Sequence, residues 1–394
     1  MFARSFQLDQ LRKSKCDSTI KIIFGIRRSG KSTLINQYQA WLKQDGISCR
    51  QIKTIDFEQD LNFFALNITT IVNKIKKSLI KEQVNYLFLD ELESLPNYQQ
   101  LVRQLVKLTN VDLYITGSDH QICKLAQQFP SQLIAVRPFR FHEFIDFHHQ
   151  PADFTSLYHY LNRGGFPFVQ NIRDDASVRN YSEDVLNTII LKGLMQHPGL
   201  VNPNLLKHLI TFLAHHPGVP INVSQAVAAL QERNIQVSNK TLASYLAFVQ
   251  EGFLFTACPE LNLTTGTVKK TNVQYFPVDP GFRCLLTNHQ GALSATNLTM
   301  LVYNELTARG FQVYSGQKGR HPVTFIATRG TKRLFFQFNF SFLNQAAYDR
   351  AINGLRHLPA TAERTLIIAK PGDHAWGKDE EFAAISLLDW LVNE

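Results

Sequence analysis

The sequence predicts an α/β protein that begins with a parallel sheet covered by helices on both faces. Three observations predict this class. An apolar run at 20–24 leads through a glycine-bounded loop into a helical stretch. A second apolar run, at 84–89, ends in two acids. Strand-like and helix-like segments alternate between and after them, at 51–57, 69–80, 98–106, 111–116 and 133–136. Such alternation is typical of parallel strands joined by helical crossovers.

Composition limits the class of protein. The 394 residues suffice for two or three domains, and 44% hydrophobic with 19% charged residues indicates a globular chain rather than a disordered one. The net charge of +9 favours a polyanionic partner, although a site for any small anion also needs positive charge. The five cysteines are scattered and form no C-x-x-C pair. Without a signal-like or membrane-length apolar run, we expect a cytoplasmic protein with no membrane partner.

The loop at 25–32 reads Gly-Ile-Arg-Arg-Ser-Gly-Lys-Ser. Between a strand and a helix this pattern predicts a P-loop, in which backbone N–H groups converge on the phosphates of a nucleotide. Lys31 would bridge the β- and γ-phosphates of ATP, and the Ser32 hydroxyl would hold Mg²⁺. The predicted nucleotide-binding residues are Gly25, Arg28, Ser29, Gly30, Lys31, Ser32 and Thr33.

The acids at the end of the second apolar run have the form of a Walker B motif. Asp90 would hold Mg²⁺ together with Ser32, and Glu91 would orient and polarise the attacking water. The strand at 111–116 leads into Thr116-Gly117-Ser118, and either Thr116 or Ser118 could contact the terminal phosphate or the water. Alternatively, this segment only turns the chain and caps the next helix. The predicted catalytic residues are therefore Lys31, Glu91, Thr116 and Ser118.

The segments 24–34, 86–91 and 114–118 resemble those of bacterial and archaeal AAA-type ATPases that carry a C-terminal domain of unknown function. Weaker similarity continues at 138–144, 164–167, 275–281 and 305–310. The resemblance implies a P-loop NTPase sheet, then a helical and winged-helix domain, and then a small α/β module related to restriction endonucleases. We expect these domains at 1–155, 156–290 and 291–394.

One departure from the family concerns arginine. Members usually show a Gly-Arg pair before the fifth strand, a candidate arginine finger, whereas 128–133 holds no arginine here and the nearest is Arg137. An arginine finger is worth orders of magnitude in turnover. The departure predicts a slow ATPase, a nucleotide binder without fast hydrolysis, or an enzyme that takes its arginine from elsewhere.

The middle of the chain has helical patterns at 180–194, 204–215 and 221–232, and another at 238–250 that opens with Ser238 as its N-cap. Strands at 253–256 and 273–276 complete a winged-helix pattern. In a DNA-reading module, Asn239, Lys240 and Ser244 would approach the major groove. Because Lys240 is the one basic residue at this helix start, packing or contact with a partner protein is the alternative.

The last part alternates again, with helices at 298–309, 345–357 and 385–392 and strands at 312–316, 322–328, 333–340 and 364–370. In metal-dependent nucleases of the restriction-endonuclease fold, the second strand carries an Asp and the third carries Glu-x-Lys. Here the corresponding positions are Thr324 and 337–339, without an acid pair or a lysine. We therefore expect a module without nuclease activity.

The pattern as a whole favours an ATP-binding, Mg²⁺-dependent, slow ATPase that acts as a nucleotide-driven conformational switch. One alternative is a regulator that binds duplex DNA through the winged helix under nucleotide control. Another is an ATP-loaded scaffold without turnover. A protein partner or self-association remains open in each case.

Overall fold

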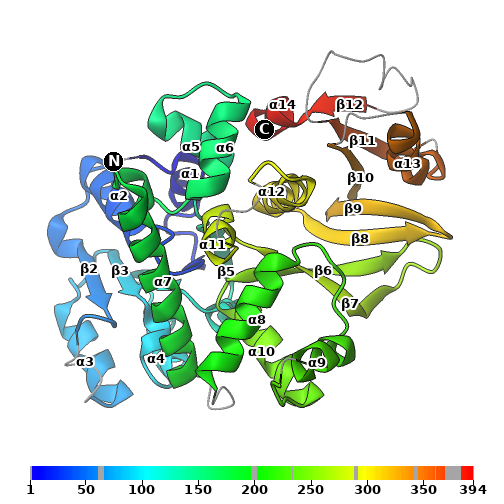
Figure 1. Cartoon of the computed structure of the whole chain (residues 1–394). Helices are drawn as coiled ribbons and strands as arrows, with labels where there is room; N and C mark the ends of the chain where they lie inside the picture. Colours follow the sequence, from blue (N-terminus) through cyan, green and yellow to red (C-terminus); the bar gives the residue numbers. More distant parts are fainter. Residues whose placement is uncertain are drawn as a thin grey trace. The chain divides into compact units, whose positions relative to one another are not determined.

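The computed structural model describes residues 2–60, 66–196, 202–232, 234–287, 292–340, 345–359, 361–368 and 383–393. The chain divides into two compact units (Figure 1). The first comprises Met1–Pro138 with Glu251–Phe253, and the second comprises Phe139–Gln250 with Leu254–Glu394. This division is into two units, and the three domains expected from the sequence stay a prediction.

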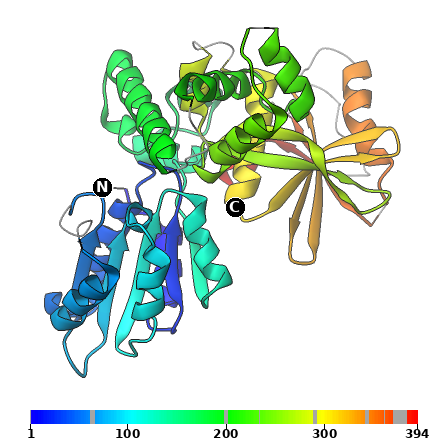
Figure 2. The ribbon, with the colours of Figure 1, turned by 90° about the horizontal axis from the view of Figure 1, so that it is seen from below.

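A five-stranded sheet forms the centre of the first unit, and every pair of neighbouring strands in it is parallel (Figure 2). The strand order is β2-β3-β4-β1-β5. The strands are β1 (Ile20–Phe24), β2 (Ile52–Asp56), β3 (Asn85–Asp90), β4 (Val111–Gly117) and β5 (Ser131–Ala135). The parallel sheet that the alternating pattern predicted is confirmed.

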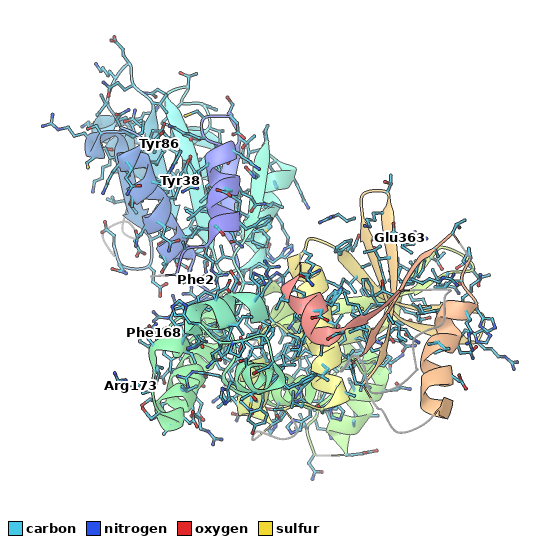
Figure 3. All side chains as sticks on the ribbon, turned by 90° about the horizontal axis from the view of Figure 1, so that it is seen from above. Phe2, Tyr38, Tyr86, Phe168, Arg173 and Glu363 are labelled. Carbon is cyan, nitrogen blue, oxygen red and sulfur yellow. The ribbon has the colours of Figure 1, made fainter. Side chains whose placement is uncertain are left out.

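Helices cover both faces of this sheet because successive residues of each strand point to opposite sides. In β3, Leu87 and Leu89 join one apolar cluster with α3 (Ile68–Ser78) and α4 (Tyr98–Leu105). Tyr86 and Phe88 join the opposite cluster with α1 (Ser5–Lys13) and α2 (Lys31–Gln44). Tyr38 of α2 belongs to this second cluster as well (Figure 3). Short 3-10 segments lie at Cys49–Gln51, Leu92–Ser94 and His120–Gln127.

The second unit contains a seven-stranded sheet in the order β12-β11-β10-β9-β8-β6-β7. Its strands are β6 (Phe255–Asn262), β7 (Val268–Pro277), β8 (Gln312–Lys318), β9 (His321–Arg329), β10 (Lys332–Asn339), β11 (Glu363–Ile368) and β12 (Ala383–Ser386). Its helices are α5 (Phe141–His148), α6 (Phe154–Arg163), α7 (Asp175–Gln196), α8 (Pro203–His215), α9 (Val223–Gln231), α10 (Asn239–Glu251), α11 (Pro280–Leu286), α12 (Ala295–Ala308), α13 (Gln345–Arg356) and α14 (Leu387–Val392). Val169–Asn171 is a 3-10 turn. None of the helices in the described part of the chain is long and apolar enough to cross a membrane.

The hairpin β6–β7 belongs to the same sheet as the last strands of the chain. β6 pairs with β8 in parallel, with Leu261 opposite Gly316. One apolar cluster contains residues of this hairpin and of the later strands. In it, the ring of Phe276 stacks on that of Tyr303 with their centroids 4.2 Å apart. The sequence did not indicate this pairing. The predicted helix at 385–392 was wrong at its start, because β12 reaches Ser386 by pairing with β11.

Two segments that are distant in sequence meet around the buried carboxylate of Asp279. Its Oδ2 accepts a hydrogen bond from the N–H of Gly165 at 2.6 Å, and its Oδ1 accepts one from the N–H of Phe282 at 3.1 Å. Gly164 has a φ of +79°, and a Cβ there would lie 2.4 Å from Asp279 Oδ1. A side chain at 164 would therefore clash with the carboxylate of Asp279. Burial raises the pKa of Asp279 to about 6.

Thr324 and Gln337 are the residues that the sequence comparison with nucleases placed at the expected metal-binding positions. The N–H of Thr324 donates to Gln337 Oε1 at 2.7 Å, and Gln337 Nε2 donates to the carbonyl of Pro322 at 3.2 Å. Gln337 thus ties β10 to β9, which is a structural role. The relationship to nucleases stays a prediction.

Candidate nucleotide-binding site

The predicted site residues converge at one edge of the first sheet. Parallel strands present their carboxyl ends at the same edge. Gly25 follows β1, Asp90 ends β3, and Thr116 and Ser118 lie at the end of β4. Because β1 and β3 both flank β4, the loop after β1 and the acids after β3 reach the same place.

Glycines fix the path of the loop between β1 and α2. Gly30 has a φ of +102° directly before Lys31, the first residue of α2. A Cβ on Gly25 would lie 2.0 Å from the carbonyl oxygen of Val136. The backbone N–H groups at the start of α2 have no partner within the helix and carry the positive end of its dipole, which suits an anion.

Ser29 lies inside this loop and is fully buried. Its Oγ has no hydrogen-bond partner within the described residues. Its carbonyl accepts a hydrogen bond at 3.1 Å from Arg4, whose guanidinium also donates to the carbonyl of Arg137 at 2.8 Å. Arg4 therefore links the loop to the segment that follows β5. Sequence reasoning missed Arg4, since nothing near it in the chain marks a site.

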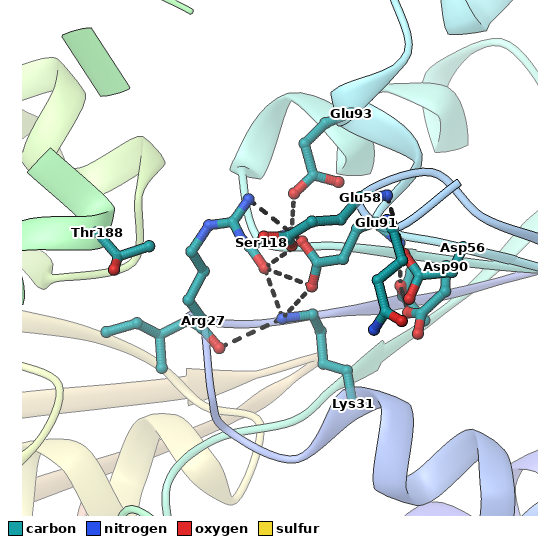
Figure 4. A network of polar contacts seen from close by, with 12 residues as sticks. Arg27, Lys31, Asp56, Glu58, Asp90, Glu91, Glu93, Ser118 and Thr188 are labelled. Atoms are coloured by element: carbon teal, nitrogen blue, oxygen red, sulfur yellow. Dashed lines mark hydrogen bonds and ion pairs between the residues drawn. The ribbon is translucent and has the colours of Figure 1, made fainter. Parts of the chain in front are cut away.

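Lys31, Glu91 and Ser118 form the centre of the site (Figure 4). Lys31 Nζ donates to Ser118 Oγ at 2.7 Å and lies 3.3 Å from Glu91 Oε1. It also donates to the carbonyl of Gly25 at 3.1 Å. Ser118 Oγ is 2.9 Å from both carboxylate oxygens of Glu91. The structure thus brings together three of the predicted catalytic side chains.

Thr116 contacts the other acid. It is fully buried, its hydroxyl donates to Asp90 Oδ1, and its oxygen accepts the N–H of Glu91 at 2.8 Å. Burial raises the pKa of Asp90 above its usual value, against hydrogen bonds from Thr116 and Ser32. The Ser32 hydroxyl and the Asp90 carboxylate therefore lie within hydrogen-bond reach of each other. Two such oxygen donors fit Mg²⁺, which binds proteins through one or two oxygens and completes its shell with water and phosphates.

Two carboxyl groups beside each other have opposite pKa shifts. Burial acts to raise the pKa of Glu91, but the charges of Lys31 and Arg27 outweigh it and hold that pKa at about 2. Burial and the charge of Glu91 raise the pKa of Glu93 to about 8. Glu93 Oε1 accepts the N–H of Ser118 at 2.7 Å. In the nucleotide-free site, Glu91 is thus a firmly ionised carboxylate and a weak base.

Arg27, Glu58 and Glu93 are site residues that sequence reasoning did not select. The loop motif places Arg27 and Arg28 side by side, and the structure turns Arg27 toward Glu91 while Arg28 is exposed with a φ of +66°. Thr33 is also exposed. Glu93 could have been noticed as the third acid of the run that begins with Asp90, whereas Glu58 carries no local signal.

Two stretches of the sequence match models of protein families. Residues 17–145 match the model of the AAA domain, and residues 154–292 match that of a domain of unknown function (DUF8612). Residues 17–145 are therefore similar to AAA domains. This similarity supports a nucleotide-binding ATPase function.

Other similar proteins cover between 73% and 100% of the chain. An uncharacterized protein of Haemophilus influenzae is 28% identical over 100% of this chain and 99% of its own. An uncharacterized protein of Methanocaldococcus jannaschii is 23% identical over 86% of this chain and 79% of its own. Among solved structures, the Walker-type ATPase of Pyrococcus abyssi is similar at 14% identity, covering 73% of this chain and 96% of that one with a TM-score of 0.48.

Outside the AAA domain, the residues predicted to approach DNA lie at the start of α10. Asn239, Lys240 and Ser244 are all exposed. The expected N-cap is confirmed, since Ser238 Oγ accepts the N–H of Thr241 at 3.1 Å. The buried residues of this helix are Leu242, Tyr245, Leu246, Phe248 and Val249.

Proposed function

We propose that this protein binds ATP with Mg²⁺ and hydrolyses it slowly, using the difference between nucleotide states as a conformational switch. The observation that carries the proposal is the convergence of Lys31, Glu91 and Ser118 beside the glycine-bounded loop. The AAA domain match over residues 17–145 supports it independently.

Each side chain has a role in this reaction. The loop N–H groups and Lys31 hold the β- and γ-phosphates. Ser32 and Asp90 hold Mg²⁺, which when bound neutralises charge on the phosphate oxygens. Glu91 orients the attacking water, with Ser118 and Thr116 fixing the two acids. The water oxygen bonds to the γ-phosphorus, the bond to the bridging oxygen breaks with its electron pair kept by ADP, and one water proton passes to Glu91.

Glu91 is a weak base before nucleotide binds, so the proposed site is inactive in that state. An efficient general base has a pKa near the working pH, whereas the pKa of Glu91 is about 2 in the presence of Lys31 and Arg27. Phosphates that engage Lys31 would draw this cation away from the carboxylate. The site therefore becomes active only when the nucleotide rearranges it.

Lys31→Ala is expected to abolish ATP binding and turnover, because the loop loses the side chain that neutralises the phosphates. Binding is measured by titration with a fluorescent ATP analogue, and turnover by phosphate release. Lys43→Ala removes an exposed lysine from the last turn of the same helix and should behave like wild type. Equal ATP affinity in Lys31→Ala and Lys43→Ala would refute the proposal. Binding without turnover in wild type would instead support the scaffold alternative.

A nucleotide-gated DNA regulator is the second candidate, favoured by the exposure of Asn239, Lys240 and Ser244 on the first turns of α10. Lys240→Glu should then weaken duplex binding and reduce the slope of log affinity against log salt by about 1. Fluorescence anisotropy with a labelled duplex, with and without ATP, measures both quantities. Lys43→Glu is the control for the change in net charge. Equal binding of duplex and inorganic polyphosphate at low salt would exclude this candidate.

A further inference from the structure

Arg27 is a charged side chain of the loop that the roles above leave unused, and unlike Arg28 it is not exposed. Its Nη1 lies 2.9 Å from Glu58 Oε2 and its Nη2 lies 3.5 Å from Glu91 Oε2 (Figure 4). Only 12% of the side chain is exposed. Burial acts to lower the pKa of Arg27, but the charges of Glu91 and Glu58 raise it, so the guanidinium is charged.

Arg27 and Lys31 share one carboxylate. Glu91 Oε2 faces Arg27 at 3.5 Å, while Oε1 faces Lys31 at 3.3 Å. In a P-loop the lysine is the residue that reaches the β- and γ-phosphates. Arg27 therefore lies next to the lysine that would reach the terminal phosphate, on the other oxygen of the same carboxylate. Arg27 also belongs to the loop whose N–H groups would hold the phosphates.

Glu58 explains how Arg27 is held before nucleotide binds. The N–H of Glu58 donates to Asp56 Oδ1 at 2.9 Å, which fixes the turn after β2. β2 is the neighbour of β3, with Asp56 opposite Asp90. The carboxylate of Glu58 thus lies on the same edge of the sheet as the acids of the site, and it pairs with Arg27 there.

We propose that Arg27 supplies, from within the same chain, the guanidinium that stabilises the transferring phosphoryl group. The inference rests on the ATPase function proposed above. As the bond to the bridging oxygen breaks, negative charge spreads over that oxygen and the three γ-oxygens. The planar guanidinium, with its fork of N–H donors, matches such a group better than an ammonium does. Arg27 then replaces the arginine that 128–133 lacks.

The test compares Arg27→Ala, Arg27→Lys and the control Arg50→Ala. Arg50 is an exposed arginine before β2, at the opposite edge of the sheet from the site. In Arg27→Ala, kcat should fall at least about 100-fold, while ADP affinity and the melting temperature stay near those of wild type. Trapping of ADP with aluminium fluoride, which imitates the transferring phosphoryl group, should be lost. Arg27→Lys should recover part of the turnover and part of the ADP trapping, and Arg50→Ala should match wild type in both.

Mixing two inactive variants separates an arginine of the same chain from one supplied by a second copy. Arg27→Ala keeps Lys31, and Lys31→Ala keeps Arg27. Their mixture should stay inactive if Arg27 acts within its own chain, whereas restored turnover would show that it acts on a neighbour and overturn the inference. Equal kcat in Arg27→Ala and Arg50→Ala would overturn it too.

The proposed function can fail separately from this inference. Wild type that binds no nucleotide removes the function itself. Wild type that binds ATP but neither turns it over nor traps ADP with aluminium fluoride leaves nucleotide binding intact and overturns the role of Arg27 alone.

Discussion

Glu91→Gln is expected to turn ATP over at least about 100-fold more slowly than wild type while binding it more tightly. The slower turnover follows because a neutral amide cannot accept the proton of the attacking water. The tighter binding follows because Glu91 holds Lys31 and Arg27 in the nucleotide-free site. ATP must compete with this carboxylate for both cations, and the amide competes less.

Isothermal titration with ATP and a phosphate-release assay measure these two effects on the same protein. Glu82→Gln alters an exposed acid of the first unit and should change neither quantity. If wild type is a scaffold with negligible turnover, the gain in affinity should remain and the rate should not change. An ATP affinity of Glu91→Gln equal to or below that of wild type would contradict the competition between Glu91 and the phosphates.

Asp279→Ala is expected to destabilise the second unit by about 3 kcal/mol, since backbone N–H groups lose their acceptor in a buried site. A loss of this size lowers the melting temperature by roughly 6–12 °C. Asp174→Ala, which removes an exposed acceptor at the start of α7, should have a smaller effect. Calorimetry on the full chain measures both, and equal effects would contradict the structural role of Asp279.

The same residue predicts a dependence of stability on pH. Burial raises the pKa of Asp279 from 3.8 to about 6, so the folded protein holds this proton more tightly than the unfolded chain does. The contribution of Asp279 to stability is therefore largest below about pH 4, and it declines as the pH rises to about 6. The difference in melting temperature between wild type and Asp279→Asn should shrink over that range. A difference that grows with pH would show that the pKa is lowered instead.

The fold of the first unit and the centre of its site were predictable because their signals are local. A P-loop is one continuous segment. An apolar strand that ends in Asp90 and Glu91 shows which end of the strand faces the site. The choice between Thr116 and Ser118 could not be made in sequence, because it depends on which acid each hydroxyl meets. In the structure, Thr116 is hydrogen-bonded to Asp90, whereas Ser118 is hydrogen-bonded to Lys31 and Glu91.

Other contacts were not predictable because they join strands that are distant in sequence. Lys21 interrupts the apolar run at 20–24, yet it is fully buried and its Nζ lies 2.5 Å from a carboxylate oxygen of Asp112 in β4. Glu58 reaches Arg27 only because β2 and β1 belong to one sheet. Similarly, the parallel pairing of β6 with β8 joins residues on either side of the predicted boundary at 290.

The pairing of β6 with β8 limits where the second unit can be cut. β6 lies inside the seven-stranded sheet, with β7 on one side and β8 on the other. A fragment that ends near residue 292, where the domain of unknown function ends, would remove β8 and leave one side of β6 with unpaired N–H and C=O groups. The same cut would strip Tyr303 and Phe325 from the ring of Phe276. Such a fragment is a template for intermolecular strand addition, so its insolubility would reveal nothing about the biological activity of the protein.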